Sequence, residues 1–287
     1  VVFSFASVSS TGTLEPWDFE EDIKAGQYQE FLDVKDEYPG TRAMIAVGGW
    51  THNEPDNERL YRFSEIASTP RSRMKFAQSS VAFLRKYGYD GLDIDWEYPG
   101  DEERGGNSTL DKDNLVLLCD ELRKYFDDAP ERFELSIAIP ASTERLEAGF
   151  DLERLARSVH FFNVMAYDLH GVWDDPPIAG AHSDIGGIDA AIEHLVTNSS
   201  VPPAQVVMGL PGYGRSYTML NDTCLALGCP FREDSNETAI GGCLDTKGFV
   251  PFVEIHNWEE EGQGKGYDSV TLDLATYSAI MVKDDDQ

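Results

Sequence analysis

The sequence predicts an α/β fold in which a parallel β-sheet is covered by helices. Strand-like runs alternate with helix-like runs, and the strand-like runs are almost continuously apolar, which is typical of strands buried on both faces. With 287 residues and 41% hydrophobic side chains, the chain is long enough for one large α/β barrel or two ordinary domains. We therefore expect a sizeable buried core.

Six strands are expected from runs rich in β-branched and aromatic residues. They cover residues 1–8, 42–49, 89–97, 133–140, 160–167 and 205–214. The first run opens the chain without an initiating methionine or a basic leader, so we expect that the natural N-terminus has been removed.

Helices are expected between these strands. Residues 70–87 have Pro70 in the first turn and Gly88 just past the end, which is the usual order of these residues around a helix. Shorter amphipathic runs at 152–158 and 188–197 predict two more helices. Another helix follows from an apolar stripe at spacings of three and four residues, made by Leu115, Leu118, Cys119, Leu122 and Phe126.

The charge balance limits the partners of the chain. Fifty-two acidic residues against 23 basic ones give a formal charge of −29, which repels nucleic acid and anionic membrane surfaces. No run of about 18 apolar residues is present to span a bilayer. We therefore expect a neutral or cationic partner, with no nucleic acid and no membrane.

Two features favour an extracellular location. Four Asn-x-Ser/Thr sequons occur in polar, loop-like surroundings, at Asn107, Asn198, Asn221 and Asn236. Three of the four cysteines, Cys224, Cys229 and Cys243, lie close together in a Gly-rich and Asn-rich segment, so we predict a disulfide within this cluster. Reduced thiols are the alternative. A zinc site lacks a fourth ligand, since neither His182 nor His256 offers one locally, and no metal or cofactor is expected.

The strongest chemical signal is a row of acids in residues 89–97. Side chains alternate between the faces of a strand, so Asp93, Asp95 and Glu97 share one face while Trp96 points the other way, into the core. Aligned carboxylates repel one another, and at least one of them then holds a proton near neutral pH. Glu97 is the last acid and emerges at the carboxyl end of the strand, where parallel α/β folds bind ligands. This order makes Glu97 a candidate proton donor.

The acid row alone leaves two other uses open. Aligned carboxylates can bind a hard cation, although the spacing of an EF-hand loop is not met. The row can also be purely structural. For Asp90 we favour a structural role, in which its carboxylate accepts hydrogen bonds from turn amides.

Four segments of the sequence resemble segments of a known family. Asp90-Gly-Leu-Asp93-Ile-Asp95-Trp-Glu97-Tyr-Pro resembles the motif of family 18 glycoside hydrolases, the chitinases and their relatives. Three further segments resemble family strands in the same order: Ala46-Val47-Gly48-Gly49-Trp50, Met165-Ala166-Tyr167-Asp168 and residues 208–215. The resemblance covers essentially the whole chain.

The resemblance implies a (β/α)8 TIM barrel that is incomplete in this chain. The visible strands correspond to barrel strands two to seven, and the chain is expected to be a fragment that lacks the first and last strands. By this alignment residues 1–214 are the barrel and residues 215–287 begin the α+β insertion domain of the family.

The resemblance also implies a secreted chitinase that retains anomeric configuration. Glu97 would protonate the glycosidic oxygen while the 2-acetamido oxygen of the substrate attacks the anomeric carbon. Asp95 would orient the acetamido group, Asp93 would tune the proton of Asp95, and Tyr167 would hydrogen-bond the acetamido carbonyl. The substrate, chitin or a chitooligosaccharide, would be bound by a monomer through Trp50, Met165, Asp168, Tyr213, Arg215, Phe5 and Gly49.

One departure and two alternatives remain. Ala46 replaces a family serine whose hydroxyl helps to hold Asp93, and losing one hydrogen bond to a charged group costs about 1.5 to 3 kcal/mol. Asp93 is therefore expected to sit differently or to titrate higher, and turnover to be slower. The alternatives are a chitin-binding lectin on the same scaffold, which the retained Glu97 argues against, and an endo-β-N-acetylglucosaminidase acting on N-glycans.

Overall fold

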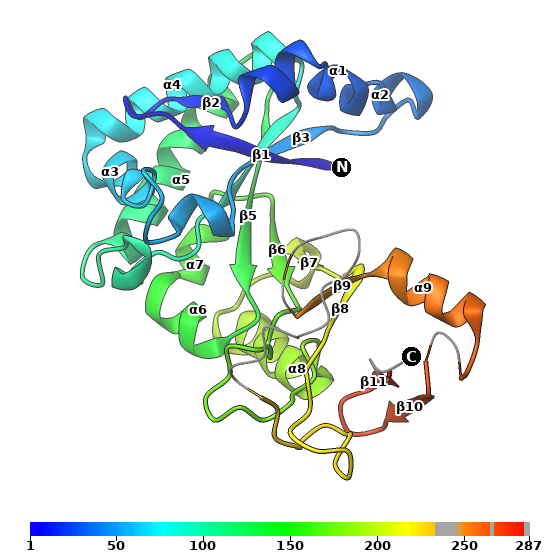
Figure 1. Ribbon diagram of the computed structural model, residues 1–287. Helices are drawn as coiled ribbons and strands as arrows, with labels where there is room; N and C mark the ends of the chain where they lie inside the picture. Colours follow the sequence, from blue (N-terminus) through cyan, green and yellow to red (C-terminus); the bar gives the residue numbers. More distant parts are fainter. Residues whose placement is uncertain (233–245, 247, 265–266, 284–287) are drawn as a thin grey trace. The chain divides into compact units, whose positions relative to one another are not determined.

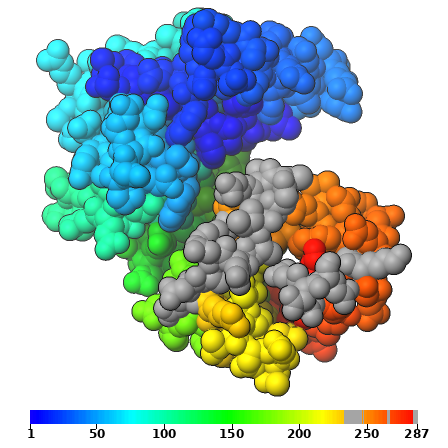
Figure 2. All heavy atoms as spheres, in the orientation of Figure 1, coloured from blue at the N-terminus to red at the C-terminus, as the bar shows by residue number. Residues whose placement is uncertain are grey.

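The computed structural model describes residues 1–232, 246, 248–264 and 267–283 (Figure 1). The other residues, which include Asn236 and Cys243, lie outside this description and are grey in Figures 1 and 2. The chain divides into two compact units. The first comprises Val1–Val164 and His194–Val207, and the second comprises Met165–Glu193 and Met208–Gln287.

One seven-stranded sheet contains a strand from each of the six expected regions. Its order is β2-β1-β3-β4-β5-β6-β7, and the pairs β1–β3, β3–β4 and β4–β5 are parallel. Short β2 pairs with β1 in the antiparallel direction. The strands are β1 (Val2–Val8), β2 (Leu14–Pro16), β3 (Met44–Gly48), β4 (Gly91–Asp95), β5 (Glu134–Pro140), β6 (Phe161–Met165) and β7 (Val206–Met208).

Helices of the first unit follow the strands in the expected alternation. They are α1 (Gln27–Leu32), α2 (Val34–Glu37), α3 (Arg62–Ser68), α4 (Pro70–Tyr87), α5 (Asp111–Asp128), α6 (Thr143–Gly149) and α7 (Leu152–Leu155), with single turns η1 (Glu20–Lys24), η2 (Trp50–Asn53), η3 (Glu102–Arg104), η4 (His194–Asn198) and η5 (Pro203–Gln205). In Figure 1, α3, α4 and α5 pack together along one side of the strands.

The boundaries of α4 agree with those predicted from the sequence. Thr69 caps the amide of Ser72, Pro70 occupies the first turn, and Gly88 ends the helix with a φ of 89°. A positive φ is easy for glycine and strained for other residues, which is why the helix ends at Gly88. The predicted stripe of α5 is likewise buried, including the free thiol of Cys119.

The prediction of one strand over residues 205–214 is wrong. Strand β7 ends at Met208, and a separate strand, β8 (Tyr213–Arg215), pairs with β9 (Phe249–Pro251) in a different sheet. The interruption contains Pro211, which has no amide hydrogen to donate to a ladder, between Gly209 and Gly212. An apolar run therefore crosses from one unit into the other.

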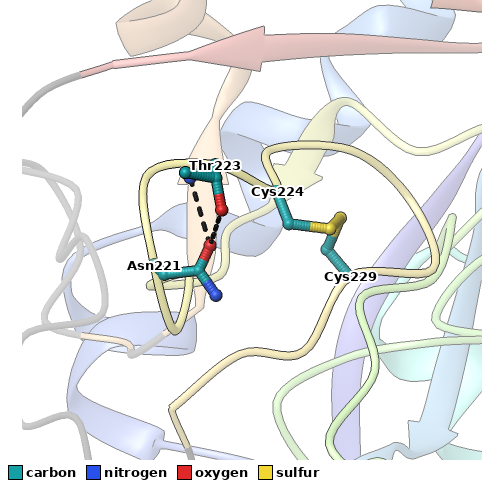
Figure 3. Close-up of a disulfide and its surroundings, with 4 residues drawn as sticks. All are labelled: Asn221, Thr223, Cys224 and Cys229. Atoms are coloured by element: carbon teal, nitrogen blue, oxygen red, sulfur yellow. Dashed lines mark hydrogen bonds between the residues drawn. A yellow bond between two sulfur atoms is a disulfide. The ribbon is translucent and has the colours of Figure 1, made fainter.

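The second unit is a mixture of short strands and helices. Beside β8 and β9 it contains α8 (Ile185–Glu193), α9 (Phe252–Glu261) and the antiparallel pair β10 (Ser269–Asp273) and β11 (Ser278–Val282). A disulfide joins Cys224 to Cys229 (Figure 3), so the predicted bond within the cysteine cluster is confirmed. Asn221, three residues before Cys224, accepts hydrogen bonds from the amide and hydroxyl of Thr223 at 3.1 and 2.6 Å.

The sequons that lie in the described part of the chain are on its surface. Asn107, Asn198 and Asn221 are all exposed, so each sequon can carry a glycan without disturbing the core. None of the helices among the described residues is long and apolar enough to cross a bilayer.

Candidate active site

Three acids are buried at the carboxyl end of β4, two within the strand and Glu97 two residues past its end. Asp93, Asp95 and Glu97 are 4%, 7% and 7% exposed, whereas Leu92 and Ile94 between them are fully buried in the core. The charges of Glu97 and Asp93 both act on Asp95, so the three carboxyl groups lie near one another. Trp96 is buried as well and stacks on a phenylalanine of α3 with ring centroids 5.4 Å apart, which confirms its predicted place in the core.

Asp93 is held by residues of the next two strands. Ser136 of β5 donates its hydroxyl to Oδ1 of Asp93, and the side-chain amide of Asn163 of β6 donates to the same oxygen at 2.8 Å. Burial raises the pKa of Asp93, and these two hydrogen bonds act in the opposite direction because they favour the charged form. Ala46 is the register partner of Asp93 on β3, so support for this carboxylate comes from the β5 side.

Asp95 is the least compensated acid of the row. Its Oδ1 has no hydrogen-bond partner among the described residues. Burial raises the pKa of Asp95 well above its usual value, and the neighbouring charges of Glu97 and Asp93 raise it further. The direction of this pKa shift is the one expected for aligned, buried carboxylates, because both desolvation and like charges favour the protonated form.

Glu97 lies just past the end of β4. The hydroxyl of Tyr98 interacts with the Glu97 side chain, and burial, followed by the charge of Glu97, raises the pKa of Tyr98. The peptide bond between these two residues is cis, as is that between Ser4 and Phe5. The main-chain carbonyl of Glu97 accepts a hydrogen bond from Nε of Arg104 at 2.8 Å.

The glycine pair at the end of β3 allows its backbone to lie close to the backbone of β4 and to the ring of Phe5. A Cβ at Gly48 would lie 2.0 Å from the carbonyl oxygen of Asp95, and a Cβ at Gly49 would lie 2.8 Å from the ring of Phe5. Both glycines have positive φ, at 112° and 85°. The Gly49 amide donates to the Asp95 carbonyl at 2.9 Å. The absence of a Cβ at both glycines therefore allows the end of β4 and the Phe5 ring to pack against this backbone.

Trp50 follows directly and is 51% exposed. The guanidinium carbon of Arg104 lies 3.5 Å from the centroid of its ring. An exposed indole that is supported on one face by a cation is a suitable platform for a sugar ring.

A second group of predicted residues lies in the second unit. Arg215 forms a two-pronged ion pair with Asp168, with Nε–Oδ1 and Nη2–Oδ2 distances of 2.8 Å each. His182 Nδ1 lies 3.5 Å from Oδ1 of Asp168. Burial raises the pKa of Asp168, but hydrogen bonds from His182, Arg215 and Tyr213 outweigh it, so the carboxyl has a pKa well below its usual range.

Aromatic rings surround this ion pair. Tyr213 stacks on Phe249 with centroids 4.4 Å apart and meets the ring of Tyr167 edge-on at 6.2 Å. The Arg215 guanidinium lies 4.9 Å from the Trp173 ring centroid. Tyr167 and Met165 are both half-buried. The predicted residues of this unit thus meet in one aromatic and charged cluster, apart from Met165, which ends β6.

Several residues of these clusters were not predicted. Ser136 and Asn163 are polar residues inside otherwise apolar strands, and this pattern is visible in the sequence. No sequence period marks the others, because they lie in loops or very short elements: Arg104 ends η3, Phe249 begins β9, and His182 and Trp173 lie in loops. Asp90 was predicted to be structural, and this is confirmed: its carboxylate accepts from the Ala43 amide and from Lys35 at 2.8 and 2.9 Å.

Comparison with known proteins gives a consistent picture. The family model described as "Glycosyl hydrolases family 18" matches residues 1–278. Mouse chitotriosidase-1 is 30% identical over 91% of this chain and 56% of the mouse protein. The probable chitinase 2 of Drosophila melanogaster is 34% identical over 77% of this chain and 45% of that protein. This chain therefore spans about half the length of these curated relatives.

A solved structure supports the same assignment. The Group IV chitinase of Ostrinia furnacalis, determined in complex with allosamidin, superposes with a TM-score of 0.87 and is 26% identical, covering 99% of this chain and 75% of that one. The six-strand series in the seven-stranded sheet is thus an incomplete (β/α)8 barrel, accompanied by part of an insertion domain. The chain belongs to family 18 of the glycosyl hydrolases.

Proposed function

We propose that this chain is part of a secreted chitinase that hydrolyses β-1,4-linked N-acetylglucosamine polymers with retention of configuration. The observation that carries this proposal is the buried row of Asp93, Asp95 and Glu97 at the carboxyl end of β4. The row places an acid, which can donate a proton, at the end of a barrel strand.

In the proposed reaction Glu97 protonates the glycosidic oxygen as the bond to the leaving sugar breaks. The acetamido oxygen of the substrate forms the new bond to the anomeric carbon and gives an oxazolinium ion, so no second carboxylate is needed as nucleophile. Water then opens the ring with Glu97 as the base. Two displacements at one carbon leave its configuration unchanged.

Asp95 and Asp93 serve the acetamido group in this scheme. Asp95 orients its N–H and stabilises the positive charge of the oxazolinium ion. Desolvation and the adjacent charges raise the pKa of Asp95, which supports a proton held within the row and passed between its members. Asp93, fixed by Ser136 and Asn163, tunes that proton.

Substrate contacts are proposed for both clusters of residues. Trp50 offers an exposed ring for stacking, and Gly49 with Phe5 shapes the adjoining wall. Tyr167 would hydrogen-bond the acetamido carbonyl, and Asp168, Arg215, Tyr213 and Met165 would bind the sugar. The ligand is chitin or a chitooligosaccharide, which is uncharged and compatible with a chain of charge −29, and the protein acts as a monomer.

Two further points belong to the proposal. Secretion is supported by the Cys224–Cys229 disulfide and by exposed sequons, because such bonds persist in oxidising compartments. We also place the barrel in residues 1–214 and the beginning of the insertion domain in residues 215–287.

The deciding experiment replaces Glu97 by Gln in the full-length protein and measures soluble sugar released from chitin. We expect activity to fall by at least about 100-fold, which is the size of a general-acid contribution. Glu153→Gln is the matched control, because Glu153 is an exposed residue of α7 whose ion pair is with Arg157, and it should retain full activity. The anomer formed first, followed by NMR, should be β.

The alternatives give different results in the same assays. Unchanged hydrolysis by the Glu97→Gln variant would sink the proposed mechanism. Wild-type protein that binds chitin beads but releases no soluble sugar would be a lectin. Release of N-glycans from a high-mannose glycoprotein, without cleavage of chitin, would identify an endo-β-N-acetylglucosaminidase.

A further inference from the structure

Arg104 connects the ends of two neighbouring barrel strands. It ends η3 and is 7% exposed, so its charge is buried. Nε donates to the main-chain carbonyl of Glu97 at 2.8 Å, and Nη2 donates to the main-chain carbonyl of Trp50. The same guanidinium lies on the indole of Trp50, 3.5 Å from the ring centroid. One side chain therefore binds the main chain of two residues, Trp50 and Glu97, each of which lies two positions past the end of its strand.

The loop around Arg104 is built to hold it in place. Gly105 has a φ of 74°, and a Cβ there would lie 2.2 Å from the carbonyl oxygen of Leu60. The side-chain amide of Asn53 donates to the carbonyl oxygens of both Arg104 and Leu60, at 3.3 and 3.0 Å. Asn53 ends the turn that Trp50 begins. The backbone of Arg104 is thus fixed to the same turn that carries the tryptophan.

A guanidinium is well suited to this place and an ammonium is not. Desolvation lowers the pKa of Arg104, while the charges of Glu97 and Asp101 oppose that effect. Arginine stays charged under such conditions, is planar, and can stack on an indole while its edge donates two hydrogen bonds. Lysine has no plane to stack and cannot reproduce both donations in a fixed geometry.

Exposure separates the roles of the two residues. Trp50 is 51% exposed although the guanidinium lies over its ring, so much of the side chain remains accessible to a ligand. Arg104 is buried beneath that ring and donates to main-chain carbonyls, so it is not placed to touch a sugar. Any effect of Arg104 on sugar binding must pass through Trp50 or through the backbone of Glu97.

We propose that Arg104 is a positioning residue that fixes the Trp50 indole relative to Glu97, so that a saccharide stacked on Trp50 presents its linkage to the acid. This inference rests on the proposed function, because it assumes that the ligand is a chain of N-acetylglucosamine. It predicts that Arg104 and Trp50 act as one unit in binding long saccharides. A purely structural arginine would change stability without coupling to Trp50.

The test is a double-mutant cycle in the full-length protein carrying Glu97→Gln, so that binding is measured without turnover. Affinities for the N-acetylglucosamine dimer through hexamer are measured by calorimetry for Trp50→Ala, Arg104→Gln and the double variant. We expect each single change to weaken hexamer binding about tenfold, and the double variant to bind about tenfold rather than about 100-fold more weakly. The losses should be larger for longer oligomers, which can reach Trp50 and the acid together.

Two companion variants separate geometry from charge and from stability. Arg104→Lys keeps the charge, so failure to restore affinity indicates that the planar guanidinium is required. Arg73→Gln is the matched control, because Arg73 is similarly buried in α4, donates to the carbonyl of Ala67 at 2.6 Å and stacks on no ring of the described residues. It should lower the melting temperature and leave saccharide affinity unchanged. If Arg104→Gln fails to fold, Arg104→Lys replaces it in the same cycle.

The outcomes distinguish this inference from the proposed function. Additive losses in the double variant, or an Arg104 variant with unchanged affinity, would overturn the positioning role while wild-type chitin hydrolysis still supported the enzyme. Coupled losses without hydrolysis by the wild-type protein would support the positioning role and reject the chitinase. Absence of saccharide binding by the parent protein would overturn both.

Discussion

Gly48 and Asp95 are packed so closely that a Cβ at Gly48 would lie 2.0 Å from the Asp95 carbonyl oxygen. The two residues are register partners on β3 and β4, and the next residue, Gly49, donates its amide to that same oxygen at 2.9 Å. This contact sets the separation of the two strands at the point where the acid row begins to emerge. The backbone of β4 therefore packs directly against the Cα of Gly48, where no side chain fits.

Replacing Gly48 by Ala should therefore be severely destabilising. The new methyl group would overlap a main-chain atom, which cannot rotate away, and the φ of 112° is already strained for alanine. We expect a loss of at least about 3 kcal/mol in the free energy of unfolding, measured by urea denaturation. Gly26→Ala is the control, because Gly26 has a φ of 89° but its Cβ position has no atom of the described residues within 4 Å. It should cost only about 1 to 2 kcal/mol, and equal losses in the two variants would contradict the packing argument.

Local sequence patterns predicted the features that a single element determines. The alternation of acids and apolar residues in β4 placed Asp93 and Asp95 on one face and Trp96 in the core. Pro70 and Gly88 bounded α4 because both act through their own backbone geometry. The crowding of cysteines predicted a bond between Cys224 and its neighbours.

Features that depend on contacts between distant segments were not predictable in the same way. Arg104 reaches Trp50 across 54 positions of the chain, and Asn163 reaches Asp93 across 70. Neither pair has a period or spacing that marks it. The break after Met208 is not visible in the apolar pattern, because the residues on both sides of it satisfy the pattern of a strand. Pro211 is the signal that limits where the ladder can continue.

Restoring the serine of the family motif should stabilise the acid row. Ala46 is 2% exposed and is the register partner of Asp93 on β3, as Ser136 is on β5, so the hydroxyl of an Ala46→Ser variant can donate to the carboxylate. We expect a gain of about 1 kcal/mol in stability, lower than the full value of a charged hydrogen bond because Asp93 already has two donors. Chitin turnover should also rise, and both are measured on purified protein.

Val47→Thr is the matched control for that substitution. Val47 is fully buried on the opposite face of β3, so the same hydroxyl is added without a carboxylate to receive it. Burial of an unpaired hydroxyl should cost about 1 to 3 kcal/mol. A destabilising Ala46→Ser would show that the position 46 hydroxyl does not reach Asp93. A stabilising Val47→Thr would show that an added hydroxyl stabilises β3 without the carboxylate, so a gain at position 46 would no longer indicate a bond to Asp93.

His52 should make the fold sensitive to acid. Its side chain is fully buried, its Nε2 accepts from the amide of Val8 at 3.4 Å, and its ring centroid lies 4.8 Å from that of Phe63. Burial, followed by the charges of Arg59 and Arg62, lowers the pKa of His52 to about 3. The histidine must therefore lose a proton on folding whenever the pH is below its unfolded pKa of about 6.5.

The sign of this linkage is fixed by the lowered pKa. Stability contributed by neutral His52 is complete above about pH 6.5 and falls by about 1.4 kcal/mol per pH unit as the pH drops toward 3. A His52→Gln variant stays neutral, and its amide oxygen can still accept from Val8. The difference in unfolding free energy between wild type and variant should shrink by about 2 kcal/mol from pH 7.5 to pH 5. A difference that is constant with pH would mean that folding does not lower the pKa of His52.

The two-pronged ion pair of Arg215 and Asp168 should contribute more than an exposed pair of the same geometry. Its contact distances are 2.8 Å, and the side chains are 13% and 35% exposed. Lysine cannot bind both carboxylate oxygens, so Arg215→Lys should cost about 1 to 2 kcal/mol after allowance for solvent screening. Arg85 binds Glu131 through two contacts of 2.8 and 2.9 Å but is 52% exposed, and Arg85→Lys should cost clearly less than Arg215→Lys.

Measurement at several pH values and salt concentrations separates the two pairs. The pKa of Asp168 is lowered in the folded state, so the stability that this carboxylate contributes is present at neutral pH and is lost as the pH falls below the unfolded value of about 4. The cost of Arg215→Lys should accordingly disappear in acid, and 1 M salt should reduce it only in part because the pair is half-buried. The Arg85 pair faces solvent, so its small contribution should vanish in the same salt. Equal costs for the two lysine variants at neutral pH would mean that the partial burial and aromatic surroundings of Arg215 add nothing to the pair.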